Sequence, residues 1–359
     1  MGDGATSLGT IKKRILLIAV NAVLVLAFIA CLVASGSIRG TLRSQQAARA
    51  WTGQSGERFA QLSVFVPDRF ILDEEALYNL RSSVDKALVA ASIEADEGRT
   101  LYTDAWSAEG DVFVIGGRGS APVRAFGVGG DFFLFHPLNL RDGSYLSPDD
   151  LMKDRVLLDE ELAWRLFGSV RVAGLEVMIG DRLHIIAGVV SREDDFASSK
   201  AYTYGAGMFM SYDSLREQTN GSARIDCYEI VLPDPITGFA LSALTDAFPD
   251  KDARIVENSA RYSLSNVFGA VGSFGERGMR TDGMIYPYWE NAARYTEDWL
   301  ALLLVLALAL IACPIVCGVI YGAKAIRVLS TRGRSIIAKK LEERDERKAE
   351  EYLRIGNRE

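Results

Sequence analysis

"HPLNLRDGSYLSPDDLMKDRVLLDEELAWRLFG", residues 136–168, is the stretch that decides between a catalytic domain and a purely structural one. It contains one of the chain's two histidines. Seven acidic residues accompany that histidine: Asp142, Asp149, Asp150, Asp154, Asp159, Glu160 and Glu161. Such a set could hold a metal ion or serve as general acid and base, or its acids could cap helices and shape turns.

Helix capping accounts for these acids. In "SPDDL" (147–151), a serine, a proline and two aspartates stand where a helix start favours a cap, a fixed first φ and negative charge. Asp159 is expected to cap a second helix, "EELAWRLFG" (160–168), which a glycine closes. Nothing in the sequence brings two of these carboxylates into one cleft, so the pattern favours structural roles over hydrolysis.

Neither histidine has the partners that metal binding or imidazole catalysis requires. His136 precedes a proline, and alternation in "RLHIIAG" (182–188) predicts that His184 points to the polar face of a strand. Neither has a second histidine or a cysteine at a metal-ligand spacing. The G-x-x-x-x-G-K-[ST] loop that cradles ATP phosphates is also missing. We therefore predict no enzyme activity and no catalytic, metal-binding or cofactor-binding residue in this chain.

Two long apolar runs predict membrane spans. Residues 15–36 and residues 299–323 carry no charge, and each exceeds the roughly 20 apolar residues that a helix needs to cross a bilayer. A removable signal peptide is the alternative for the first run, but its apolar core would be shorter, about 7–15 residues. We expect both runs to span the membrane.

Flanking charge predicts the orientation of these spans. Lys12, Lys13 and Arg14 precede the first span, and a basic stretch follows the second: Lys324, Arg327, Arg332, Arg334, Lys339 and Lys340. Positive flanks stay in the cytoplasm, so both termini are expected inside, at the plasma membrane, and the middle region outside. The net charge is −7 for the whole chain, +2 for residues 1–14 and +4 for residues 324–359. The middle region therefore carries a net charge of −13. That acidic balance argues against a nucleic-acid partner.

The second span has two further features. Pro314 is expected to kink its helix, because proline removes a backbone hydrogen bond. Before the span, "IYPYWENAARYTEDW" (285–299) is rich in the aromatic side chains typical of the membrane–water interface. Four residues are predicted as interface anchors: Tyr286, Tyr288, Trp289 and Trp299.

The middle region predicts an α+β domain. A strand at 62–67 and an amphipathic helix at 72–93 begin one strand–helix–strand unit, and residues 227–258 form a second. Two such units around an inserted, mostly-β region indicate a split α+β domain. Inside the insertion, 175–191 predicts a hairpin that turns at Gly180. Glycines spaced three apart over 269–278 favour a flexible connector.

The predicted segments follow one another along the chain. They are a cytoplasmic N-terminus (1–14), a first transmembrane helix (15–36), a stalk (37–61), an extracytoplasmic core domain (62–283) with its insertion (about 107–205), a membrane-proximal aromatic segment (284–298), a second transmembrane helix (299–323) and a charged helical cytoplasmic tail (324–359). The fold class is therefore an α+β extracytoplasmic domain between two transmembrane helices.

The opening stretch and the hairpin after it resemble the extracytoplasmic core domain of MacB-type ABC transporter permeases. The matching positions lie in two glycine-closed phrases: Gly143, Leu162, Ala163, Leu166, Phe167, Gly168, Gly174, Gly188 and Val189. The resemblance covers residues 60–260 and rests on no catalytic residue. It implies a subunit that transmits motion, with ATP bound by a partner and no cofactor in this chain. Family permeases carry four spans, so we expect a reduced two-span variant here.

Two functions follow as hypotheses. The first is a non-catalytic permease-like subunit of an ABC-type export or mechanotransmission complex, partnered by a cytoplasmic ATPase and by a second permease or another copy. The second is a membrane-anchored extracytoplasmic scaffold or sensor without ATP coupling, because a fold does not fix a function. The basic stretch 324–340 would contact partners or lipid headgroups, or would serve only to orient the span.

Overall fold

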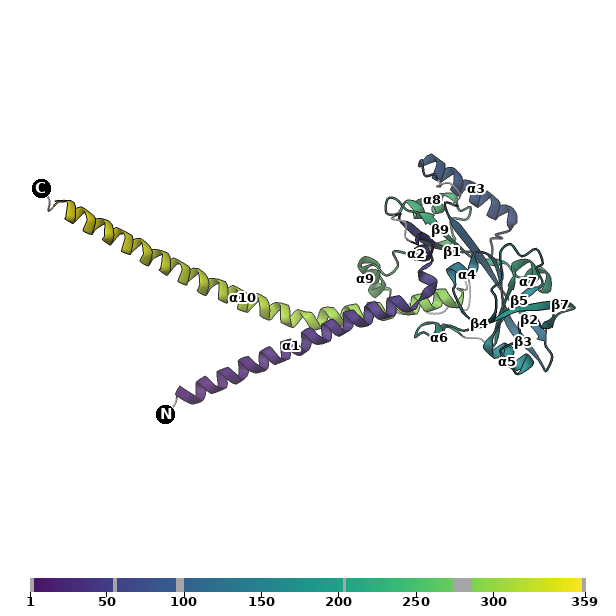
Figure 1. The fold of residues 1–359 in the computed structure, drawn as a ribbon, viewed down its shortest axis with the longest axis horizontal. Helices are drawn as coiled ribbons and strands as arrows, with labels where there is room; N and C mark the ends of the chain where they lie inside the picture. Colours follow the sequence, from purple (N-terminus) through teal and green to yellow (C-terminus); the bar gives the residue numbers. More distant parts are fainter. Residues whose placement is uncertain (1–2, 54–56, 95–99, 203–204, 274–285, 357–359) are drawn as a thin grey trace. The chain divides into compact units, whose positions relative to one another are not determined.

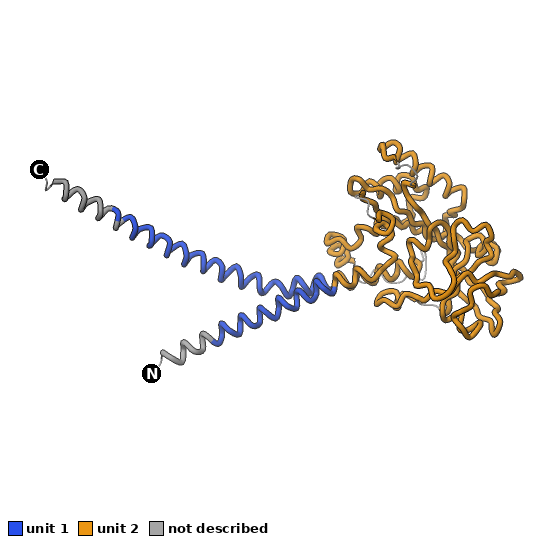
Figure 2. The backbone as a smooth tube through the Cα atoms, in the orientation of Figure 1, with its two compact units in different colours: residues 1–34, 303–359 blue, residues 35–302 orange. Residues whose placement is uncertain are grey.

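The computed structural model describes residues 3–53, 57–94, 100–202, 205–273 and 286–356. Contacts divide the chain into two compact units, shown in Figure 2: residues 1–34 with 303–359, and residues 35–302. We call them the helical unit and the core unit, and describe each separately.

The helical unit consists of the greater parts of two long helices, α1 (Asp3–Thr41) and α10 (Tyr288–Gly356). Both are long and apolar enough to cross a membrane, and only 6% and 17% of their most apolar windows are buried. Helices so exposed cannot be the core of a soluble domain. Inside this unit the Asn21 amide lies 3.7 Å from Cys317 Sγ and donates to the Leu17 carbonyl at 2.8 Å. α10 continues through Pro314.

Within the described residues, ten strands of the core unit form one sheet (Figure 1). Its path is β10-β1-β9-β2-β3-β8-β5-β7-β4, and β6 pairs with β2 and β7. The first four strands of this path come from two strand–helix–strand units. One consists of β1 (Phe59–Phe65), α3 (Glu74–Ala90) and β2 (Thr103–Ile115). The other consists of β9 (Ile225–Pro233), α8 (Phe239–Ala247) and β10 (Arg254–Glu257). The units interleave, because β9 lies between β1 and β2 while β1 lies between β9 and β10. This is the predicted split arrangement.

Helix α3 shows how the sequence dictates this half of the fold. The Asp73 side chain accepts from the Ala76 N–H at 2.9 Å and caps the helix, and two glutamates follow in the first turn. Its buried face consists of Leu77, Leu80, Val84 and Leu88. These side chains pack with α8 and the first strands in one apolar cluster.

The inserted region extends the same sheet. Its strands are β3 (Ser120–Gly130), β4 (Asn139–Gly143), β5 (Arg155–Asp159), β6 (Glu176–Ile179), β7 (Arg182–Ser191) and β8 (Gly207–Ser211). Its helices are α4 (Phe132–Phe135), α5 (Glu160–Phe167), α6 (Ser198–Ala201) and α7 (Tyr212–Gln218). β2 pairs with β9 at one end and with β3 along eleven positions from Ala105 to Ile115. One long strand therefore joins the two halves.

The diagnostic stretch 136–168 matches its predicted turns only in part. Asp159 caps α5 by accepting from the Leu162 N–H at 2.7 Å, and Gly168 closes the helix at φ 70°. The prediction of a helix after Ser147 is wrong. Ser147 and Asp150 close a tight turn, with the Ser147 N–H donating to Asp150 Oδ2 at 3.1 Å. Ser and Asp favour such turns as readily as caps.

Two segments that flank the predicted spans can be compared with the sequence predictions. The predicted stalk begins as a continuation of the first apolar helix, since α1 extends to Thr41. It goes on in η1 (Arg43–Gln45) and α2 (Ala47–Thr52), which pack into the core unit. The first two glycines of the 269–278 series are helical, in α9 (Leu264–Gly272), so a flexible connector is wrong for them. The other two glycines lie outside the described residues.

Candidate functional site

The base of α10 carries a buried ion-pair network. The guanidinium of Arg261, in the loop before α9, donates from Nη1 and Nη2 to the Glu290 carboxylate at 2.6 and 2.8 Å. Its Nε donates to Glu297, which lies about two turns further along the same face of α10. Arg294 Nε donates to Glu290 at 2.7 Å. All four residues are at most 6% exposed, so two arginines and two glutamates balance one another inside the protein. We call these four residues the junction.

The charges of the junction support one another. Burial alone would raise the pKa of Glu290, but Arg261 and Arg294 outweigh it and hold that pKa below its ordinary value. Burial lowers the pKa of Arg261, and the Glu290 carboxylate more than restores it. The Arg294 Cζ atom also lies 3.5 Å from the centroid of the Tyr286 ring, which is a cation–π contact. Removing one partner would leave an uncompensated buried charge.

A chain of buried hydrogen bonds connects the junction to the sheet. Arg261 Nη1 donates to Asn258 Oδ1 at 3.3 Å, and the Asn258 amide donates to Ser63 Oγ of β1 at 2.6 Å. Ser63 donates to Glu229 of β9 at 2.8 Å, and the other Glu229 oxygen contacts His136 Nε2. The polar path therefore runs from α10 through β1 and β9 to His136, at the end of α4.

His136 is a structural histidine in this path. It is fully buried, and we assign its proton to Nε2, which then donates to Glu229. Its ring lies 4.3 Å from Trp289 and 4.5 Å from Phe132, centroid to centroid. Nδ1 has no hydrogen-bond partner among the described residues. An enclosed ring without room for a substrate fits a structural role.

His184 does not lie where the alternation predicted. It is 2% exposed and lies on the buried face of β7, whereas its neighbours Leu183 and Ile185 are 55% and 39% exposed on the opposite face. Burial lowers the pKa of this imidazole. Within the described residues, no group of three His, Cys, Asp or Glu side chains could hold a metal ion.

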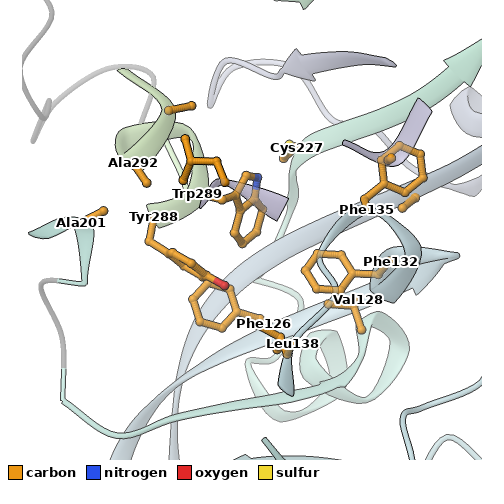
Figure 3. Close-up of a cluster of buried hydrophobic side chains, with 14 of the residues drawn as sticks. Phe126, Val128, Phe132, Phe135, Leu138, Ala201, Cys227, Tyr288, Trp289 and Ala292 are labelled. Atoms are coloured by element: carbon orange, nitrogen blue, oxygen red, sulfur yellow. The ribbon is translucent and has the colours of Figure 1, made fainter. Parts of the chain in front are cut away.

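Three of the four predicted interface anchors are wrong. Tyr286, Tyr288 and Trp289 are 5%, 1% and 3% exposed, in the largest apolar cluster of the core unit. Figure 3 shows Tyr288 and Trp289 directed toward Phe126 and Phe132. Rings buried in a protein core cannot lie among lipid headgroups. Trp299, 36% exposed, remains a candidate anchor.

The first membrane helix is tied to the same strand as the junction. The buried amide of Gln61, in β1, donates to the Ser44 carbonyl at 2.7 Å and accepts from the Ala47 N–H at 2.9 Å. Its backbone carbonyl accepts from the Asn258 N–H at 2.8 Å. β1 therefore bonds to the segment after α1 and to the loop that holds the junction.

Sequence reasoning missed the junction residues. Glu290, Arg294 and Glu297 share one helix face at i, i+4 and i+7, which is the signal that could have found them. Their aromatic neighbours led instead to an interface interpretation. Arg261 carries no local signal of an ion pair, since its two glutamate partners lie 29 and 36 residues away.

The predicted basic residues lie on exposed positions of α10, in the helical unit: Lys324, Arg327, Arg332, Arg334, Lys339 and Lys340. Pro314 lies inside the same helix. Their roles in binding partners or lipid, and in kinking the helix, stay predictions.

The core unit also has an open cavity of about 310 Å³. Arg81 and Trp106 form one wall, with the guanidinium 5.1 Å from the ring centroid, and the turn at Ser147–Asp150 forms another. Both Glu229 and His136 lie outside its lining. The polar path therefore does not open into this cavity.

The chain is similar to known proteins. A family model described as the MacB-like periplasmic core domain matches residues 22–247. The periplasmic region of MacB from Actinobacillus actinomycetemcomitans is similar at 17% identity, over 57% of this chain and 92% of that one, with a TM-score of 0.42. The extracellular domain of the ABC-type transporter YknZ from Gram-positive bacteria is similar at 14% identity, over 56% and 100%, with a TM-score of 0.35. No curated protein matches the sequence.

Proposed function

The chain belongs to the MacB-like periplasmic core domain family, and we propose that it is a non-catalytic, permease-like subunit that couples a cytoplasmic ATPase to its extracytoplasmic domain. Family membership and two apolar helices make it a membrane protein with an extracytoplasmic core domain. In this proposal ATP binds to the partner, and the complex exports a substrate or transmits motion. A second permease or another copy of this chain completes the membrane part.

The junction is the observation that carries the proposal. Arg261 holds two glutamates of α10 and, through Asn258 and Ser63, the central strands β1 and β9. The contacts of Arg261 with the two glutamates are charge-assisted and buried, and the one with Glu290 is bidentate, which makes them strong and directional. Because the base of α10 is fixed to the sheet in this way, a shift of the helix would carry the sheet with it.

Transmission would begin at the cytoplasmic end of α10. ATP binding and hydrolysis on the partner would move the helix, and the basic residues of 324–340 would supply the contact with the ATPase or with lipid headgroups. Both termini would lie in the cytoplasm, as the positive flanks predict. Gln61 would carry the matching movement of α1 to β1.

Affinity purification of the full chain from its native membrane in mild detergent tests this proposal. We expect an ATP-hydrolysing subunit to co-purify. Arg332→Gln with Arg334→Gln should reduce the amount recovered severalfold, while four other basic residues keep the span oriented. Arg332→Lys with Arg334→Lys is the matched control and should retain the partner better. Recovery of the wild-type chain without an ATPase or a second permease would contradict the proposal.

A further inference from the structure

Helix α9 exposes an apolar face. Its nine residues, "LSNVFGAVG", include no charged side chain. Val267 and Ala270 are buried against the core unit, whereas Leu264 and Phe268, one turn apart, are 68% and 65% exposed. The outer side of α9 therefore carries two large apolar side chains beside the exposed Ser265 and Asn266, and a second apolar environment would cover these two side chains.

The loop before α9 contacts α10, and these contacts show which part of α10 lies nearest to the start of α9. Arg261 Nε donates to Glu297, and the Tyr262 hydroxyl donates to the Ala293 carbonyl at 3.5 Å. α9 begins three residues after Arg261. Glu297 precedes Trp299 by two residues, about 3 Å along a helix axis. The start of α9 therefore lies close to the point where the apolar run of α10 begins. Figure 1 shows α9 beside this part of the core unit.

A second exposed aromatic residue lies at the same height. Phe196, in the loop before α6, has its ring centroid 5.3 Å from Tyr295 and 5.3 Å from Trp299. Phe196 is 45% exposed and Trp299 is 36% exposed. Two separate segments of the chain thus place apolar side chains around the helix turn that enters the apolar run.

We propose that Leu264, Phe268, Phe196 and Trp299 form a lipid-contacting surface that rests in the headgroup layer of the outer leaflet. The surface is continuous with the membrane span, because α10 runs without a break from Trp299 into residues whose apolar side chains are exposed, such as Leu302 and Val305. Uncharged, aromatic-rich segments favour this interfacial layer. The surface would hold the core unit at a fixed height above the bilayer, and it does not depend on ATP coupling.

Depth-dependent quenching tests this surface on the full chain in phosphatidylcholine nanodiscs. An environment-sensitive fluorophore is attached to Phe268→Cys or Phe196→Cys after the four native cysteines are replaced by serine. Leu151→Cys is the matched control, since Leu151 is apolar and 95% exposed in the turn region of the insertion. We expect lipids with a nitroxide near the headgroup to quench the labels at 268 and 196 at least twofold more than the label at 151.

Equal quenching at 268 and 151 would overturn the proposal. So would a label at 268 that is shielded from water, unquenched by lipid and cross-linked to a second copy, because the surface would then be a protein interface. Phe268→Trp and Leu151→Trp with brominated lipids repeat the comparison while all native cysteines are retained, in case the cysteine-free chain fails to fold. The wild-type chain, whose Trp299 belongs to the surface, gives the background quenching of the native tryptophans. Equal quenching of the two added tryptophans above this background would also overturn the proposal.

Discussion

At the scale of single residues, Asp226 has an unusual environment. It lies at the start of β9, and its Oδ1 is covered and has no hydrogen-bond partner among the described residues. Burial, and then the nearby charge of Glu109, raise the pKa of this carboxyl well above its ordinary value. The cavity beside it, about 340 Å³, is also lined by Asp68, Arg124 and Arg224. The ionised form of Asp226 therefore costs stability in the folded protein.

Asp226→Asn should stabilise the core unit at neutral pH. A folded-state pKa raised above the unfolded value of about 3.9 means that stability is complete at low pH and falls as pH rises through the folded pKa. The amide escapes this loss, so we expect a gain on the order of 1 kcal/mol at pH 7. Thermal unfolding of the detergent-solubilised chain between pH 4 and pH 8 measures it. A gain that does not shrink toward pH 4 would exclude this electrostatic explanation.

Local rules predicted some residues well and others poorly. Asp159 was predicted as a helix cap, and it caps α5, because capping depends on residues three positions apart. The predicted position of His184 was wrong because the apolar residues of the alternation, Leu183 and Ile185, lie on the exposed face of β7 and His184 lies on the buried face. His136 was predicted to be structural, but its partner Glu229 is 93 residues away and could not be foreseen.

At the scale of elements, the junction between α10 and the sheet is the connection that the proposed function needs. Glu290→Ala removes the carboxylate that both Arg261 and Arg294 contact, and leaves buried positive charge. We expect the free energy of unfolding to fall by about 3–5 kcal/mol. Urea unfolding of the solubilised chain, followed by near-UV circular dichroism, measures this loss.

Glu160→Ala is the control for this measurement. Its ion pair with Arg141 is much more exposed, with side chains 37% and 54% accessible, so its loss should cost less than about 1 kcal/mol. The pKa of Glu290 is held low in the folded state, so its contribution is present above the unfolded pKa of about 4.3 and is lost as pH falls. Equal losses for the two variants at pH 7 would show that the junction does not stabilise the protein.

Elements with a local pattern were predicted from the sequence, and elements that depend on distant partners were not. The two strand–helix–strand units, the hairpin β6–β7 and both long apolar helices follow from periodicity and turn residues, whereas the interleaving of the two units does not. The aromatic segment 284–298 was misinterpreted, because Tyr and Trp suit a membrane interface and a buried core equally well in composition. Tyr288 and Trp289 lie in the core because they contact Phe126 and Phe132, which are distant in the sequence.

At the scale of the whole molecule, the family and the fold could be recognised from glycine-closed phrases that shape the core. The network that would connect the membrane helix to the sheet could not be recognised in the sequence. Its residues come from separate parts of the chain: Ser63, Glu229, Asn258 and Arg261. A function that depends on transmitted motion leaves no compact motif of the kind that catalysis leaves.

Hydrogen–deuterium exchange of the purified complex, with and without ATP, tests the coupling most directly. We predict that ATP changes amide protection in the peptides around Asn258–Arg261 and in strands β1 and β9 of the wild-type complex. In Glu290→Gln, which keeps the shape of the side chain but loses its charge, the change in β1 and β9 should fall at least severalfold. Identical exchange in the core unit with and without ATP, in a complex that hydrolyses ATP, would contradict the account.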